Sequence, residues 1–229
     1  SLGCPKNRVD TERLLGVFGP ELEAVDSPSE AQIVLVNTCG FIQPAVEESV
    51  SAILELAETL GEMDGEARPL LAVAGCLVSR YGAEDLGREM DEVDLWLSTR
   101  ELQDWPRLVR QALKERAGEL GETGPRALST GPSYAYLKIA EGCGHSCAFC
   151  TIPSIRGGLN SEQPGKLISE AASLLEQGVK EIILVAQDLT TFGRDLGDAS
   201  LLKLVESLLP LKGLARLRLM YLYPAGLTE

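Results

Sequence analysis

Three cysteines lie within a short loop, in the sequence EGCGHSCAFC at positions 141–150. They are Cys143, Cys147 and Cys150, so the spacing is C-x3-C-x2-C, and one loop can bring all three thiolates to one point. Thiolates are soft ligands that suit iron–sulfur clusters, which normally take four cysteines. A local set of three therefore predicts an iron–sulfur cluster that keeps one iron open for a substrate or cofactor.

Two other interpretations of this loop remain possible. A structural zinc site would need a fourth ligand to close its tetrahedron. The only histidine, His145, lies between the cysteines, but C-x-H-x-C is poor spacing for zinc, and we interpret His145 as a loop residue. The last alternative is a set of three buried thiols without any metal.

The remaining cysteines, Cys4, Cys39 and Cys76, are separated by 35 and 37 residues, close to the length of one βαβ unit. Each follows a predicted strand directly. Consecutive strand ends in a parallel sheet lie at the same edge, where open α/β folds bind their ligands. We therefore predict a second three-cysteine cluster, with the alternative that these cysteines are small core residues.

The first part of the chain is predicted to be a doubly wound α/β domain with a parallel sheet, over residues 1–114. Apolar segments at 31–39 and 70–76 are typical of buried strands, and residues 1–4 resemble the end of a third. An amphipathic helix is predicted at 45–63, and another around Trp105 closes this part. Strands that alternate with helices indicate a parallel sheet.

A second domain is predicted over residues 133–229, after a linker at 115–132 that is rich in Gly, Pro and small polar residues. The predicted strands are 134–140, 181–188 and 216–224, and helices are predicted near 164–177 and 199–209. Three βα units cannot close a barrel. We therefore interpret the sequence as a fragment of a longer protein.

Charge and hydropathy exclude several classes of function. The net charge of −13 is uneven, because residues 1–132 hold 12 Lys and Arg against 24 Asp and Glu. A nucleic-acid-binding protein normally carries a basic face, which is absent from this sequence. No apolar run approaches the roughly 18 residues of a membrane helix, and the opening residues SLGCPKNRVD do not have the pattern of a leader peptide, so we expect none. We expect a cytoplasmic protein without membrane partners, in which thiols stay reduced.

Segments around both cysteine sets resemble the radical S-adenosylmethionine (SAM) methylthiotransferases, and within them the branch that acts on ribosomal protein S-twelve. The resemblance runs from residue 1 to residue 229. The segments that carry it are SLGCPKN, NTCGFI, AGCL, IPSIRG, ILVAQDLTTFG and LMYLYP.

This resemblance implies a fold and a reaction. The second domain would be the first half of a radical-SAM β/α barrel, and the rest of the barrel and a small β-domain would be absent. Two 4Fe–4S clusters would be bound, one by Cys4, Cys39 and Cys76 and one, catalytic and SAM-binding, by Cys143, Cys147 and Cys150. The family adds a methylthio group to the β-carbon of an aspartate, using a radical generated from SAM. An electron donor such as flavodoxin or ferredoxin would be a partner, and the sulfur donor is unknown.

Side chains that contact SAM are predicted next to the clustered cysteines. Gln187 and Asp188 end the second barrel strand, where barrel enzymes place catalytic residues, and Arg156 could bind a carboxylate or stack on a base. Asp188 could instead cap a helix or turn. Two positions depart from the family pattern: Gly144 replaces the usual Asn, and Glu162 replaces a typical Arg.

Two rival functions remain. The first is a tRNA methylthiotransferase, which would perform the same chemistry on an adenosine. The second is a non-catalytic zinc or iron–sulfur scaffold. Metal content and SAM cleavage would distinguish the scaffold from an enzyme, whereas only a substrate assay separates the two transferases.

Overall fold

The computed structural model of the chain describes residues 1–18, 23–63, 68–117 and 126–226. The chain divides into two compact units, Ser1–Ala127 and Leu128–Glu229, and each is described by itself.

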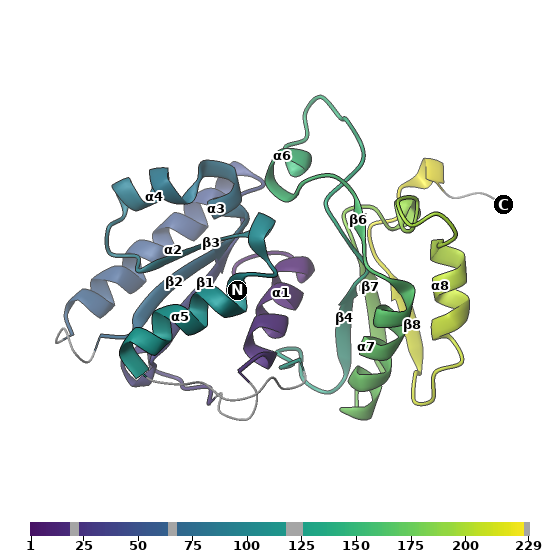
Figure 1. The fold of residues 1–229 in the computed structure, drawn as a ribbon, viewed down its shortest axis with the longest axis horizontal. Coiled ribbons are helices and arrows are strands. Elements are labelled where there is room, and N and C mark those ends of the chain that lie inside the picture. The colour runs from purple at the N-terminus through teal and green to yellow at the C-terminus, as the bar shows by residue number, and fades with distance from the viewer. Residues whose placement is uncertain (19–22, 64–67, 118–125, 227–229) are drawn as a thin grey trace. The chain divides into compact units, whose positions relative to one another are not determined.

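The first unit contains a three-stranded parallel sheet with helices between its strands (Figure 1). The strand order is β1-β2-β3, and the register pairs Ile33 with Leu70 and Thr38 with Gly75. The elements of this unit are α1 (Pro5–Gly16), β1 (Ile33–Thr38), α2 (Gln43–Gly61), β2 (Leu70–Gly75), α3 (Cys76–Tyr81), α4 (Ala83–Glu89), β3 (Leu95–Ser98) and α5 (Trp105–Ala117), with short 3-10 turns at Pro28–Glu30 and Thr99–Glu101.

Helices cover both faces of this sheet. Alternate strand residues point to opposite sides, so each face presents apolar side chains that pack against helices. On one face, Ile53 and Leu60 of the amphipathic helix α2 pack against Val73. On the other face, α1 and α5 contribute Leu14 and Trp105, which are both buried. Every residue of the central strand β2 is buried, as expected for a strand covered on both sides.

The second unit contains another three-stranded parallel sheet and a short antiparallel pair of strands. The parallel strand order is β4-β7-β8, and β5 pairs with β6. The elements are β4 (Tyr134–Lys138), β5 (Ala140–Glu141), α6 (Ile152–Arg156), β6 (Asn160–Ser161), α7 (Pro164–Glu176), β7 (Glu181–Val185), α8 (Leu201–Leu208) and β8 (Arg216–Leu219), with 3-10 turns at Leu189–Thr191 and Pro224–Gly226.

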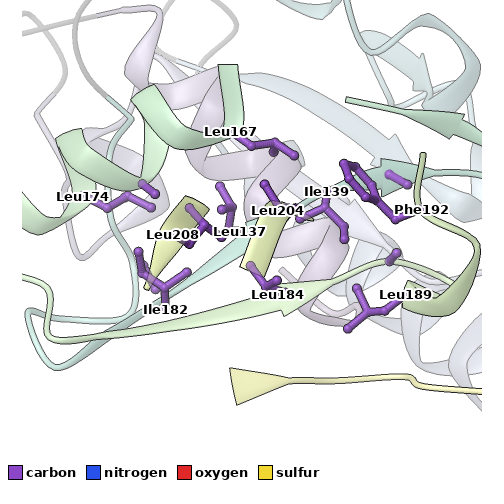
Figure 2. Packing of buried hydrophobic residues seen from close by; sticks show 14 of the residues in the cluster. Leu137, Ile139, Leu167, Leu174, Ile182, Leu184, Leu189, Phe192, Leu204 and Leu208 are labelled. Atoms are coloured by element: carbon purple, nitrogen blue, oxygen red, sulfur yellow. The ribbon is translucent and has the colours of Figure 1, made fainter. Parts of the chain in front are cut away.

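One face of this second sheet packs against α7 and α8 to form the core of the unit (Figure 2). Leu137 of β4 and Leu184 of β7 are fully buried there, together with Leu167, Leu174 and Leu208 from the helices. This core fixes the carboxyl ends of β4 and β7. The cysteine loop leaves the first of these strand ends, and Gln187 and Asp188 follow the second.

The predicted mixed α/β class with parallel sheets is confirmed. The doubly wound arrangement and the partial barrel stay predictions. One expected strand end is wrong, because residues 1–4 are not in a strand. Pro5 begins α1 there, a position that Pro favours, and Leu2 N donates a hydrogen bond to Asn37 O at 2.8 Å.

The predicted domain boundaries also stay predictions. Helix α5 continues past residue 114 to Ala117, and the 118–125 part of the expected linker lies outside the described residues. Beyond it, Arg126 forms a buried ion pair with Glu12, which has no exposed surface. Within the described ranges, no helix combines the length and the apolar character needed to cross a membrane.

Candidate functional site

The upstream cysteines lie where strands or helices of the first unit begin or end. Cys39 follows β1 directly and Cys76 follows β2 directly, and the last residues of these paired strands, Thr38 and Gly75, are register partners. The two cysteines therefore leave the same edge of the sheet, as predicted from the sequence. Cys4 precedes the first residue of α1 rather than the end of a strand.

A buried asparagine lies between two of these sulfurs. The Oδ1 atom of Asn7 is 3.6 Å from Cys4 Sγ and 3.8 Å from Cys76 Sγ, so both thiols donate hydrogen bonds to one oxygen. Cys39 is held by Ser49, whose hydroxyl accepts from Cys39 N at 3.2 Å and donates to Cys39 O at 3.1 Å. Two of the three upstream sulfurs therefore share one polar contact.

Each upstream cysteine is next to a glycine that has no room for a side chain. A Cβ at Gly3 would lie 2.4 Å from Asn7 Nδ2, and one at Gly40 would lie 2.8 Å from the backbone of Cys76. At Gly75, where φ is +109°, a Cβ would lie 2.4 Å from Thr38 O. The approaches at Gly40 and Gly75 bring the segments of Cys39 and Cys76 together, whereas the approach at Gly3 lies within the segment of Cys4 itself.

The downstream cysteine loop begins and ends at the antiparallel pair of β5 and β6. Gly142 has a φ of +66°, and a Cβ there would lie 2.0 Å from Gly158 O. Cys143 N donates to Gly157 O at 3.1 Å, and Cys150 N donates to Cys147 O at 3.1 Å. These contacts fold the loop back on itself, so that its three cysteines line one pocket.

This pocket has a volume of about 320 Å³. It brings together the three clustered cysteines and two of the predicted SAM-contact residues, Gln187 and Asp188. The residues that line it are Cys143, His145, Cys147, Cys150, Gln187, Asp188, Tyr221, Leu222 and Tyr223. The third predicted contact, Arg156, is not in its lining.

Arg156 instead binds Glu141, which is the centre of a buried polar network next to the pocket. The carboxylate of Glu141 accepts hydrogen bonds from Arg156 Nη1 at 2.8 Å and from Lys138 Nζ at 2.7 Å. It also accepts from Gln187 Nε2 at 3.3 Å. Burial alone would raise the pKa of Glu141, but the charges and hydrogen bonds of Lys138 and Arg156 outweigh burial and hold the pKa well below its ordinary value.

The contact with Glu141 determines which end of the Gln187 amide stays available. Because Nε2 is directed at the carboxylate, the Oε1 atom of Gln187 remains, and it is buried without a hydrogen-bond partner. Thr151 Oγ1, next to the last cysteine of the loop, is also buried without one. Buried polar atoms are normally satisfied, so such atoms beside a pocket are expected to bind a ligand or water.

Asp188 caps the 3-10 turn Leu189–Thr191 through a hydrogen bond from Thr190 N at 2.9 Å, which confirms the capping interpretation. It also contacts His145 Nε2 at 2.8 Å. Burial acts to raise the pKa of Asp188, but hydrogen bonds from Thr190 and His145 lower it below the ordinary value. His145 thus ties the cysteine loop to the end of β7, a role that its place in the loop did not indicate.

The cysteine thiols are donors that suit soft metals and iron–sulfur clusters. All six cysteines lie in the described part of the chain and form no disulfide. Among the described residues, no three His, Cys, Asp or Glu side chains are close enough together to hold a metal ion. Three thiols around a pocket that also offers an unsatisfied amide oxygen nevertheless match a cluster with one open iron, because soft thiolate ligands select such clusters.

The two departures from the family pattern have mild structural consequences. A Cβ at Gly144 would be 3.7 Å from Leu159, an ordinary contact, so the loop has room for a side chain. Glu162 pairs with Lys166 at 2.8 Å and does not line the pocket. The negative charge of Glu162 is therefore balanced locally.

Sequence reasoning did not single out three residues at this site: Glu141, Tyr221 and Tyr223. Tyr221 has a φ of +68°, which is uncommon for a bulky residue, and such strain tends to occur at functional sites. The ring of Tyr223 lies 5.4 Å from that of His145. The quoted segment LMYLYP contains both tyrosines, but only the fold brings them next to the cysteine loop.

Comparison with known proteins adds independent information. Residues 1–98 match the family model described as "Uncharacterized protein family UPF0004". The chain carries a UPF0004 domain. Over 99% of its length it is 59% identical to a protein of Oleidesulfovibrio alaskensis named "Ribosomal protein uS12 methylthiotransferase RimO". Proteins of that name from Nitratidesulfovibrio vulgaris and Geobacter sulfurreducens are 58% and 44% identical, in each case over 100% of this chain.

The chain spans about half the length of these relatives, since it covers 52% of the first two and 53% of the third. The UPF0004 domain contains all three upstream cysteines. The pocket lies beyond that domain but within the region aligned with the RimO proteins, whose name describes them as transferases of a methylthio group.

Proposed function

We propose that the full-length protein is a radical SAM methylthiotransferase. Its substrate would be an aspartate of ribosomal protein S-twelve, and the methylthio group would be added to the β-carbon. Cys4, Cys39 and Cys76 would hold one 4Fe–4S cluster. Cys143, Cys147 and Cys150 would hold a second, which also binds SAM.

The observation that carries this proposal is the pocket of the second unit. Three cysteines line it, together with Gln187 and Asp188 at the end of the next parallel strand. A catalytic iron–sulfur cluster needs a cavity beside its open iron, whereas a closed structural zinc site needs none. The identity of the chain to the RimO proteins supports the same assignment.

When bound, the clusters and SAM would supply one-electron chemistry and a radical that removes a hydrogen atom. The chain's own residues would bind and orient SAM. Gln187 Oε1 would accept a hydrogen bond from a donor group of SAM, because its nitrogen is held by Glu141. Arg156 would act through Glu141, to which it is bound, rather than by direct contact with SAM. Tyr221 and Tyr223 would form an apolar wall of the pocket.

The charge of the chain favours a protein substrate over tRNA. Acidic residues outnumber basic ones two to one in residues 1–132, which would repel a polyphosphate and attract a basic ribosomal protein. The alternative function, which a substrate assay must distinguish from this one, is that of a tRNA adenosine methylthiotransferase. We expect a cytoplasmic enzyme that receives electrons from a flavodoxin or ferredoxin.

Iron content and SAM cleavage test the assignment of the clusters. The full-length protein, reconstituted anaerobically, should bind two 4Fe–4S clusters, about eight irons per chain. Replacing Cys143, Cys147 and Cys150 with Ala should remove about half of this iron and abolish reductive cleavage of SAM. If this triple variant still cleaves SAM, the assignment of the second cluster is wrong.

A further inference from the structure

We propose that Asn7 is the positioning residue of the upstream cysteines: its side-chain oxygen sets the distance between the sulfurs of Cys4 and Cys76. The inference rests on the proposed function, in which these sulfurs bind a cluster, and it assigns a role to a residue that is not itself a ligand. Asn7 contacts both sulfurs directly, at 3.6 Å and 3.8 Å.

The orientation of the Asn7 amide is fixed by the hydrogen bonds that its nitrogen atom donates. Nδ2 donates to Asn37 Oδ1 at 3.0 Å and to Thr38 O at 2.7 Å, which uses both of its hydrogens. Asn37 is oriented in turn, because its own Nδ2 donates to Asn7 O at 2.9 Å and to Thr11 Oγ1 at 2.9 Å. The oxygen of Asn7 must therefore face the sulfurs.

Burial makes this orientation costly to change. Asn7 and Asn37 each expose only 1% of their surface, so an amide turned the wrong way would have no water to replace its lost hydrogen bonds. Leaving a buried donor or acceptor unsatisfied costs about 1–3 kcal/mol. The pair of amides is thus a rigid support for two side chains that are otherwise weak hydrogen-bond donors.

The three upstream cysteines do not depend on Asn7 equally. Cys76 follows strand β2, and Cys39 follows β1 and is held by Ser49 on helix α2. Cys4 does not follow a strand, since residues 1–4 are not in the sheet; its backbone segment is tied to β1 by the hydrogen bond from Leu2 N to Asn37 O, but this bond does not reach the sulfur. Asn7 joins Cys4 to the strand ends, because it bonds both to the sulfur of Cys4 and to Thr38 at the end of β1. Loss of Asn7 should therefore move Cys4 and leave Cys39 in place.

A cross-linking experiment on the reduced, metal-free full-length protein tests this role. Dibromobimane fluoresces when it bridges two nearby thiols, and peptide mapping identifies the bridged pair. We expect Asn7→Ala to slow formation of the Cys4–Cys76 bridge about ten-fold. Alkylation of Cys39 by a monofunctional reagent should stay at the wild-type rate.

Two further variants keep the test informative if Asn7→Ala fails to fold. Gly3→Ala leaves Asn7 in the chain but puts a Cβ 2.4 Å from Asn7 Nδ2, at an exposed residue outside helices and strands. It should slow the same bridge. Gly61→Ala is the matched control, because a Cβ there meets nothing within 4 Å, and it should cross-link like wild type.

The iron content after reconstitution provides a second readout. In a background in which the downstream cysteines Cys143, Cys147 and Cys150 are replaced with Ala, reconstitution should load about four irons. Gly3→Ala should reduce this iron content, and Gly61→Ala should not. A wild-type bridging rate in Gly3→Ala, or an equal loss of bridging in Gly61→Ala, would overturn the role of Asn7. If bridging falls as expected but the parent background binds no iron, the role of Asn7 stands and the proposed cluster fails.

Discussion

Replacing Glu141 with Ala is the perturbation for which the structure gives the clearest magnitude. The substitution removes a carboxylate that binds Lys138 and Arg156, whose side chains are 5% and 1% exposed. Removing one partner of a buried ion pair typically costs 3–5 kcal/mol, because the other charge stays buried. We therefore expect the second unit to lose about 3–5 kcal/mol of stability.

Glu162→Ala is the matched control. It removes the same type of side chain from an ion pair in the same unit, but its partner Lys166 has a side chain that is 66% exposed. Exposed pairs contribute about 0–1 kcal/mol, so the control should differ little from wild type. Comparing the two variants separates the buried network from the general effect of losing a glutamate.

Hydrogen exchange of the metal-free full-length protein measures the loss of stability separately for the strands of each unit. A loss of 3–5 kcal/mol should speed exchange at the slowest amides of β4 and β7 by more than about a hundred-fold. The amides of β1 and β2, in the other unit, provide an internal reference. If Glu141→Ala speeds exchange in β4 and β7 no more than Glu162→Ala does, the network around Glu141 does not stabilise the unit.

Dependence on pH gives a second check of the same network. The pKa of Glu141 is lowered from an ordinary value of 4.5, so the folded state binds this proton less readily than the unfolded state does. The contribution of the carboxylate is therefore complete above about pH 5 and is lost as the pH falls below that range. The stability difference between wild type and Glu141→Gln should shrink on acidification below about pH 4.5, with no such change between pH 6 and pH 8.

Three other predictions follow from the geometry. Gly142→Ala should destabilise the cysteine loop by more than about 2 kcal/mol and reduce iron loading, because φ is positive at this residue and its Cβ would overlap a carbonyl oxygen. Gly158→Ala should have neither effect, because a Cβ there would meet no other atom. Replacing Cys39 or Cys76 with Ala should leave SAM cleavage largely intact and eliminate methylthio transfer. If these variants make the methylthio product at the normal rate, the two cysteines are core residues and not cluster ligands. Asp188→Ala should lower the free energy of unfolding by about 0.5–2 kcal/mol through loss of its cap, measured as a lower unfolding temperature, and an unchanged temperature would contradict the capping role.

The parts of the fold that could be predicted from the sequence are those with a local cause. The strands at 33–38 and 70–75 are continuous apolar runs, and helix α2 has a clear apolar face, so their type follows from composition and periodicity. The convergence of Cys39 and Cys76 follows from their place after paired strands. By contrast, β3 has only four residues, too few for its pattern to be distinguished from that of a loop.

Features that depend on tertiary contacts could not be predicted. Nothing in the spacing of Lys138, Glu141 and Arg156 indicates that Arg156 binds the carboxylate rather than a ligand. The contact between His145 and Asp188 joins residues 43 positions apart, through the arrangement of a loop and a strand end. Asn7 lies in a segment quoted for its cysteine, but its contact with a second sulfur, 69 positions away, appears only in the fold.

The measurement that tests the central claim most directly is mass spectrometry of the modified substrate. A host that lacks both methylthiotransferase activities would be complemented with the full-length gene, and its ribosomal proteins and digested tRNA would be analysed together. We predict a methylthio mass increment on one aspartate of ribosomal protein S-twelve and none on tRNA adenosine. An increment on the adenosine with none on the ribosomal protein would contradict the proposed function.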